Sequence, residues 1–196
     1  MFIAKNQLDT YAIIQQSLQN IHPFSEEQIK LFQEHTTVKF LPKNTLLLKP
    51  GEVCDFVAIL LEGSLRLFHP EGESEHTLAF YTETDFVGDH DSFTQQQPSK
   101  NSIAALEATV VATININKIH LLISLDTAFL VLARIIGEWS IPSQLWVNSP
   151  SPIKRFELLM KTHPGWVVRF PQKYLASYLG MAPETFSRMK RKSLFS

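Results

Sequence analysis

The segment 170–192 constrains the fold of this chain more than any other stretch. In its first part, three apolar residues fall on one face of a predicted helix, namely Leu175, Ala176 and Leu179. Pro171 suits the first position of this helix, because proline has a fixed φ and lacks an N–H. Gly180 then allows a sharp turn at positive φ, and Pro183 begins the next helix. The pattern predicts two short helices joined by a tight turn.

The second of these helices is amphipathic and basic. Phe186 and Met189 are three residues apart and are expected to face the first helix. The outward side is then expected to carry side chains that reach base edges and phosphates in a major groove. An ordinary pair of surface helices with a solvated basic end is the alternative interpretation. The residues predicted to contact DNA from the two helices are Gln172, Lys173, Glu184, Thr185, Arg188, Lys190, Arg191 and Lys192.

The distribution of charge favours the DNA interpretation. Residues 151–196 contain nine Lys and Arg against two Glu, a net charge of +7, whereas the whole chain has a formal net charge of −1. Residues 1–150 therefore carry −8. An acidic body joined to a basic terminal part indicates a phosphate-binding module attached to something that does not bind phosphate backbones. Double-stranded DNA is the expected partner.

The residues before this basic part are expected to be mostly β. A helix is predicted at 8–18, and a capping box opens a second at Ser25 to Gln28. Five short apolar or alternating runs then predict strands, at 38–48, 56–61, 64–68, 76–81 and 110–116. Turn signals between them, such as Pro50-Gly51 and Glu62-Gly63, favour a β-barrel or jelly roll.

A long helical stripe is expected after the last predicted strand. Its members are Leu125, Phe129, Leu132, Ile136 and Trp139. Pro142 falls inside the helix expected to run from about 125 to 148, where it would kink it at a cost of ~3 kcal/mol. A proline- and serine-rich hinge, 148–152, follows. These signals divide the chain into three predicted parts, 1–120, 121–148 and 149–196.

The composition of the chain limits the classes of protein to which it can belong. The chain has 196 residues, enough for two small domains, and its only cysteine is Cys54, so it has no internal disulfide or cysteine-rich zinc site. Its first residues lack the pattern of a signal peptide, and the apolar stretch 120–137 is interrupted by Asp126 and Arg134. We therefore expect a cytoplasmic protein with no membrane span.

In order and in motifs, the whole chain resembles regulators of the Crp/Fnr family, the cyclic-AMP receptor protein type. Three stretches carry the resemblance: 48–68 with its Pro50-Gly51 and Glu62-Gly63 turns, Asp85-Phe-Val-Gly-Asp89, and 153–159 leading into 171–192. The resemblance implies an α+β chain with an N-terminal β jelly-roll sensor of cyclic-nucleotide-binding type at 1–120. A long dimerisation helix at 121–148 and a C-terminal helix-turn-helix DNA-binding domain at 149–196 are implied to follow. It further implies a homodimeric, effector-responsive transcription regulator that reads bases with Glu184, Thr185 and Arg188.

The resemblance also locates an effector site, formed by Gly88, Asp89, Ser99 and Lys100. In family members that bind cyclic nucleotides, a glycine-acid pair holds the ribose hydroxyl, and an arginine with a small hydroxyl residue holds the phosphate. Here Gly88-Asp89 matches the first pair, but Ser99-Lys100 replaces the second. A lysine lacks the two-pronged donor of a guanidinium, so binding of cyclic AMP in the usual way is not expected. The effector stays unknown.

Three alternatives remain open. A signalling or scaffold module could keep the sensor fold and have lost DNA binding. A metal-dependent cupin-type enzyme is disfavoured, because no His-x-His pair accompanies His69, His76, His90 or His120. Haem sensing through Cys54 or His76 has no supporting motif, so no cofactor, metal site or catalytic residue is predicted. Only 193–196 follow the last helix, which predicts no β-hairpin wing and a modest DNA affinity per protomer.

Overall fold

The structure is a computed structural model that describes residues 6–72, 74–133 and 151–194. Its internal contacts divide the chain into two compact units. The first unit comprises Met1–Arg66 and Phe80–Trp139, and the second comprises Leu67–Ala79 and Ser140–Ser196. The hairpin segment Leu67–Ala79 is therefore grouped with the C-terminal helices.

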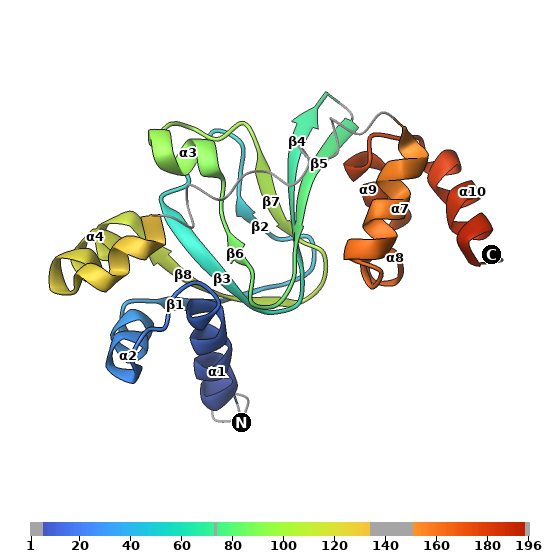
Figure 1. The fold of residues 1–196 in the computed structure, drawn as a ribbon. Helices are drawn as coiled ribbons and strands as arrows, with labels where there is room; N and C mark the ends of the chain where they lie inside the picture. Colours follow the sequence, from blue (N-terminus) through green and yellow to red (C-terminus); the bar gives the residue numbers. More distant parts are fainter. Residues whose placement is uncertain (1–5, 73, 134–150, 195–196) are drawn as a thin grey trace. The chain divides into compact units, whose positions relative to one another are not determined.

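The β-structure consists of two four-stranded sheets, as the short apolar runs predict. One sheet has the order β1-β8-β3-β6 and the other β2-β7-β4-β5 (Figure 1). The strands are β1 Thr37–Leu41, β2 Leu46–Leu48, β3 Phe56–Glu62, β4 Leu65–Glu71, β5 Ser74–Tyr81, β6 Phe86–Val87, β7 Ser102–Ala105 and β8 Thr109–Asn115. The predicted run 38–48 is split by a turn into β1 and β2. The five predicted runs do not include β6 or β7, because segments of two and four residues show little periodicity. The prediction of a jelly roll is confirmed.

The glycine after β3 is required by its surroundings. Gly63 has φ +92°, and a Cβ placed on it would lie 2.6 Å from the carbonyl oxygen of Ala108 and from Oγ1 of Thr109. Gly51 also has a positive φ, +87°, but nothing lies within 4 Å of its Cβ position. Both predicted turns therefore exist, and only the turn at Gly63 also excludes a side chain by packing.

Helices of the first unit pack against strands β3 and β8 of the sandwich. α1 is Asn6–Gln19, α2 is Glu26–Glu34, α4 is Ile116–Leu125 and the 3-10 helix η1 is Thr127–Leu130. The predicted capping box is confirmed, since Ser25 accepts from the amide of Gln28 and the Gln28 side chain accepts from the amide of Ser25. α1 packs against α2 and β3, while Phe129 of η1 stacks on Phe24 with a ring-centroid separation of 5.4 Å.

The predicted helical stripe is wrong at its start. α4 ends at Leu125, because Asp126 has extended backbone angles and instead caps η1 through a 2.8 Å bond from the amide of Ala128. Leu125 is 58% exposed, whereas Phe129 is fully buried, so the two do not share one helical face. An N-capping aspartate within an apolar run begins a new helix and breaks the old one. The rest of the predicted dimerisation helix, including Pro142, lies outside the described residues.

The second unit contains the C-terminal helices. They are α7 Pro152–Thr162, α8 Trp166–Arg169, α9 Gln172–Tyr178 and α10 Pro183–Leu194. α7 has Pro152 in its first turn and Ser151 as its N-cap, so the last two residues of the predicted hinge begin a helix; residues 148–150 of that hinge lie outside the described residues. Among the helices of the described ranges, none is both long and apolar enough to cross a membrane.

Candidate functional site

The predicted effector site lies at the start of the short helix α3, His90–Gln95. Asp89 is its N-cap, and the Asp89 carboxylate accepts from the amide of Ser92 at 3.4 Å. The Asp89 residue is only 4% exposed. A carboxylate buried to this degree needs hydrogen-bond donors, since an unpaired buried charge is costly.

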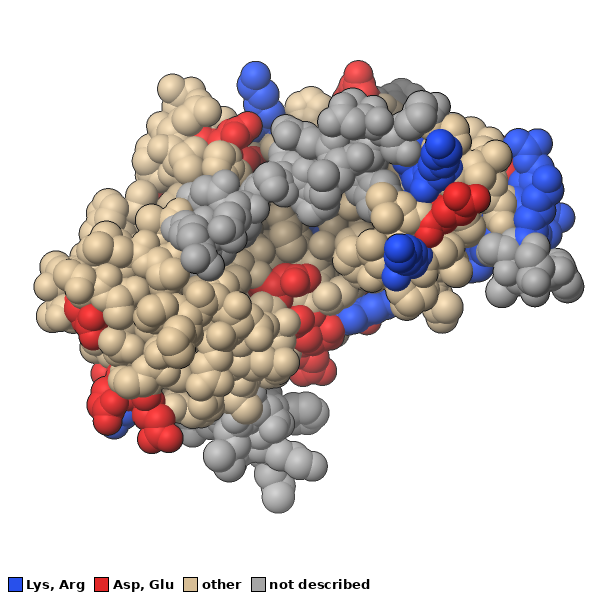
Figure 2. Space-filling view, viewed as in Figure 1, with Lys and Arg blue, Asp and Glu red and all other residues tan. Residues whose placement is uncertain are grey.

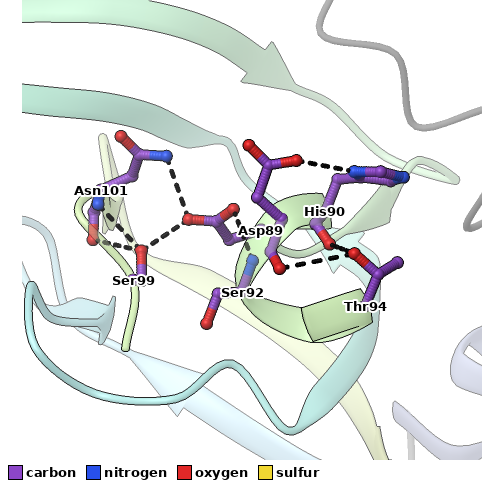
Figure 3. A network of polar contacts seen from close by, with 7 residues as sticks. Asp89, His90, Ser92, Thr94, Ser99 and Asn101 are labelled. Atoms are coloured by element: carbon purple, nitrogen blue, oxygen red, sulfur yellow. Dashed lines mark hydrogen bonds and ion pairs between the residues drawn. The ribbon is translucent and has the colours of Figure 1, made fainter. Parts of the chain in front are cut away.

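Those donors come from the chain itself (Figure 3). Ser99 donates its hydroxyl to Oδ2 of Asp89 at 2.5 Å, and Asn101 donates its side-chain amide to the same oxygen at 3.0 Å. The Ser99 hydroxyl also accepts from the Asn101 amide N–H at 2.8 Å. We call Asp89, Ser92, Ser99 and Asn101 the carboxylate network. It occupies both oxygens of the acid that the resemblance assigns to a ribose hydroxyl.

The backbone of Ser99 is clamped as well. Gly51 donates its amide to the Ser99 carbonyl at 2.8 Å, and Ser99 donates its own amide to the Glu52 carbonyl at 2.8 Å. These two backbone hydrogen bonds to the segment 51–52 fix the position of Ser99, from which its hydroxyl reaches Asp89. This links two of the sequence stretches that carry the family resemblance.

The four predicted effector residues have different environments. Asp89 and Ser99 are brought together directly, while Gly88 is buried and its carbonyl accepts from the phenol of Tyr81 at 3.3 Å. Burial, with the nearby Asp89 carboxylate as a smaller cause, raises the pKa of that Tyr81 phenol. Lys100 is exposed to solvent.

Sequence reasoning missed Ser92, Asn101 and the structural role of Cys54. Cys54 donates its amide to the Ser92 hydroxyl at 2.9 Å, and its Sγ accepts from the Asp89 amide at 3.4 Å. Burial raises the pKa of the Cys54 thiol to about 11. The available signal was the Asp89-x-x-Ser92 spacing, which is an N-cap pattern for a helix.

The histidines predicted to be scattered do not form a cluster in the part of the chain that the structure describes. No group of three or more His, Cys, Asp or Glu side chains there is arranged to hold a metal ion. His90 pairs with its neighbour Asp91 at 3.0 Å, and the Asp91 side chain is 76% exposed.

The predicted turn between the last two helices has the expected geometry. Gly180 has φ +62°, and it donates its amide to the Ser177 carbonyl at 3.0 Å. Met181 donates its amide to the Ala176 carbonyl at 2.9 Å. These two bonds form a Schellman motif that ends α9 and frees the chain to begin α10 at Pro183. Pro171 is the N-cap of α9 with extended angles, one position earlier than predicted.

A compact core holds this helix pair against α7 and α8. Phe186 of α10 is fully buried and meets Phe156 of α7 edge to face, with ring centroids 5.5 Å apart. The buried residues of the four helices are Phe156, Leu159, Val167, Phe170, Leu175, Ala176, Tyr178, Leu179 and Phe186. α10 therefore has one face fixed to the core and the opposite face available.

That opposite face carries most of the residues predicted to contact DNA. Glu184, Arg188 and Arg191 fall on one stripe of α10 at helical spacing and are exposed. Lys192, Gln172 and Lys173 are also exposed, and Thr185 is half-buried. Figure 2 shows Lys and Arg side chains gathered where α10 lies in Figure 1.

Lys190 has a different position. Its Nζ donates to the carbonyl of Val167 in α8 at 3.0 Å, so its side chain is directed at the core side of the helix pair. We therefore regard Lys190 as a residue that ties α10 to α8, whereas Arg188 and Arg191 face outward.

Comparisons with known proteins agree with this architecture. Residues 38–126 match the cyclic nucleotide-binding domain family. FixK2 from Bradyrhizobium japonicum has 15% identity and a TM-score of 0.67, covering 80% of this chain and 83% of FixK2. A CooA mutant from Carboxydothermus hydrogenoformans has 16% identity and a TM-score of 0.67, covering 91% and 83% respectively. The catabolite activator protein of Thermus thermophilus has 18% identity and a TM-score of 0.57, covering 88% and 84%. A search of curated sequences gave no match.

Residues 38–126 are thus similar to the cyclic nucleotide-binding domain family, and the chain shares its fold with solved regulators of the Crp/Fnr type. The resemblance drawn from the sequence is confirmed at the level of fold. At these identities, the likeness to solved structures concerns the fold alone.

Proposed function

We propose that this protein is a DNA-binding transcription regulator that inserts α10 into the major groove. The observation that carries the proposal is the exposed stripe of Glu184, Arg188 and Arg191 on a helix whose other face is fixed by Phe186. An arginine so placed can donate two hydrogen bonds to a guanine edge, and the flanking cations can bind phosphates. The +7 charge of residues 151–196 supports attraction to a duplex.

The proposal includes an N-terminal unit that does not bind cyclic AMP in the usual way. Two observations support this. Both oxygens of Asp89 already accept hydrogen bonds from the chain, and Ser99 stands where the resemblance places an arginine. A ribose hydroxyl would compete with Ser99, Asn101 and the Ser92 amide for a nearly buried carboxylate, and a cyclic phosphate would meet a serine rather than a guanidinium at position 99. The effector of this sensor is of another kind, or the sensor responds to a partner.

We further propose that the protein acts as a homodimer in the cytoplasm, where its DNA target is. Two recognition helices could then occupy major grooves one turn apart, ~34 Å. An effector or partner at the sensor would change whether both helices are correctly placed.

Fluorescence anisotropy of the full chain with a labelled duplex from upstream of its own gene tests the DNA proposal. We expect affinity that falls as salt rises, and a loss of about 5- to 100-fold in Arg188→Ala. Lys118→Ala in the first unit is the control and should bind like the parent. Equal binding by parent and Arg188→Ala, or equally weak binding to every duplex, would instead favour the scaffold alternative.

Thermal unfolding with millimolar cyclic AMP tests the effector proposal. A ligand at 100 times its dissociation constant would stabilise the protein by about 2.7 kcal/mol. We expect no shift with cyclic AMP beyond that seen with inorganic phosphate. A clear, saturable shift would refute the proposed loss of usual nucleotide binding.

A further inference from the structure

Ser177 of α9 joins the helix-turn-helix to the hairpin segment of the same compact unit. Its Oγ accepts from the backbone amide of Thr77 at 2.9 Å and donates to the backbone carbonyl of Glu75 at 3.0 Å. Both partners lie on β5, which is the edge strand of its sheet. Thr77 is fully buried at this contact, although it is polar.

The Ser177 hydroxyl makes the two hydrogen bonds that a neighbouring strand would make with β5. In a strand, the N–H of one residue and the C=O of the residue two before it point to the same side. A serine hydroxyl both donates and accepts, so one side chain can engage the two groups at once. Ser177 is flanked on α9 by Ala176 and Tyr178, which are both buried, so this turn of α9 is fixed in the core of the helices.

The contact lies on the same stripe of α9 as a predicted DNA contact. Lys173 is four residues before Ser177, one helical turn away on the same face. The described part of the hairpin carries two exposed glutamates, Glu71 and Glu75, and the Glu75 carbonyl binds Ser177. Because the DNA backbone carries about one negative charge per 1.7 Å of helix axis, a glutamate held beside this stripe disfavours the approach of a duplex to Lys173.

We propose that the Ser177 hydroxyl is a latch that keeps the hairpin on α9 and thereby lowers the affinity of the protein for DNA. This inference rests on the proposed function. DNA binds the conformation in which the hairpin no longer contacts the face of α9 that carries Lys173 and Ser177. Weakening the latch raises the population of that form and hence the apparent affinity.

DNA titrations of the full-length Ser177→Ala variant test the latch. Alanine is a better helix former than serine, so α9 itself is retained. A net hydrogen bond changes an equilibrium by a few fold, so we expect binding about 3- to 10-fold tighter than the parent at the same salt concentration. The control is Ser124→Ala, which removes a surface hydroxyl of α4 bonded to the Leu121 carbonyl. Unchanged or weaker binding by Ser177→Ala overturns the proposal.

Hydrogen exchange gives a readout that does not depend on DNA. We expect the Thr77 amide to be protected in the parent and to exchange faster in Ser177→Ala, with no change in Ser124→Ala. An unprotected Thr77 amide in the parent would overturn the latch. If Ser177→Ala speeds exchange of the Thr77 amide but Arg188→Ala has no effect on DNA binding, the contact between Ser177 and Thr77 exists. That combination would nevertheless reject both the proposed DNA-binding function and the inhibitory role of the contact.

Discussion

Asp89 illustrates how a fold satisfies a buried carboxylate. The carboxylate caps α3 and accepts from the Ser99 hydroxyl and the Asn101 side-chain amide, so both of its oxygens have hydrogen-bond donors within the protein. In a site built for a ligand, such an acceptor would be completed by the ligand. Here the completion is provided by the chain, which makes the network part of the folded unit's own stability.

Removal of this carboxylate should therefore be costly. We expect Asp89→Ala to lower the free energy of unfolding by about 3 kcal/mol, because the buried Ser99 hydroxyl and the partly buried Asn101 amide lose a charged acceptor. Urea denaturation at neutral pH measures this change. Asp91→Ala is the matched control, and it should change stability by less than about 0.5 kcal/mol since Asp91 is 76% exposed. Similar losses for the two variants would contradict the role assigned to Asp89.

Cys54 should be chemically inert in the folded protein. Its thiol is fully buried and burial raises its pKa to about 11, so only about one molecule in a thousand is a thiolate at pH 8. A chromogenic thiol reagent should therefore not react with the native protein but should report one thiol per chain in denaturant. Because Cys54 is the only cysteine, the signal has one source. Rapid reaction of the native protein would show that the site opens readily.

At this scale, sequence reasoning located some residues and missed others for a physical reason. Asp89 and Ser99 were predicted together because a family motif aligns them. Asn101 was not, because a side chain that completes a network is defined by its distance to an acceptor, and distance is not visible in a sequence. Lys190 was assigned to DNA from its charge, whereas its carbonyl partner on Val167 is visible only after folding.

Among the elements, the turn from β3 to β4 offers a direct test of packing. Gly63→Ala should cost about 3 kcal/mol or more, because backbone strain at φ +92° adds to overlap with the Ala108 carbonyl and Thr109. Gly51→Ala has the same strain without neighbours and should cost about 1 kcal/mol. Chemical denaturation of both variants gives the comparison. Equal costs would mean that the structure relaxes around a new Cβ at Gly63.

The junction between α4 and η1 should make stability depend on pH. A hydrogen bond from the Gln28 side chain, at 2.7 Å, lowers the pKa of Asp126, and the amide of Ala128 lowers it further. A carboxyl with a lowered folded pKa stabilises the protein above its unfolded pKa of about 4, and this contribution is lost as pH falls through the folded value. We expect the parent to be more stable than Asp126→Asn at pH 7, with the gap closing as the pH falls below the unfolded pKa of about 4. Gln28→Ala should narrow the pH 7 gap; a gap that stays constant with pH would contradict this assignment.

Elements with strong local signals were predicted, and those defined by tertiary contacts were not. The capping box at Ser25 and the Schellman turn at Gly180 depend on neighbouring residues, so their sequences sufficed. The end of α4 at Leu125 depends on Asp126 preferring to cap η1 and to bond Gln28, 98 residues away in the chain. The predicted apolar stripe continues past Asp126, because one capping residue does not change the helical periodicity of the apolar residues around it.

At the scale of the whole molecule, exposed leucines on α4 and η1 are consistent with the proposed dimer. Leu121, Leu125 and Leu130 are 44%, 58% and 55% exposed. We expect sedimentation at micromolar concentration to give twice the chain mass of 22.4 kDa, and Leu125→Glu to shift the equilibrium toward the monomer. His120→Glu, on another side of α4, is the control. A parent that sediments as a monomer at every concentration would reject the dimer.

The seating of Ser177 on β5 has one more consequence. An open strand edge is a template on which another polypeptide can add a strand, and this is a common route to misassembly. By engaging the amide of Thr77 and the carbonyl of Glu75, a helix residue occupies the two groups that an incoming strand would need there. If the hairpin leaves α9 when DNA is bound, the nucleic-acid complex is the state in which this sheet becomes open to foreign strands.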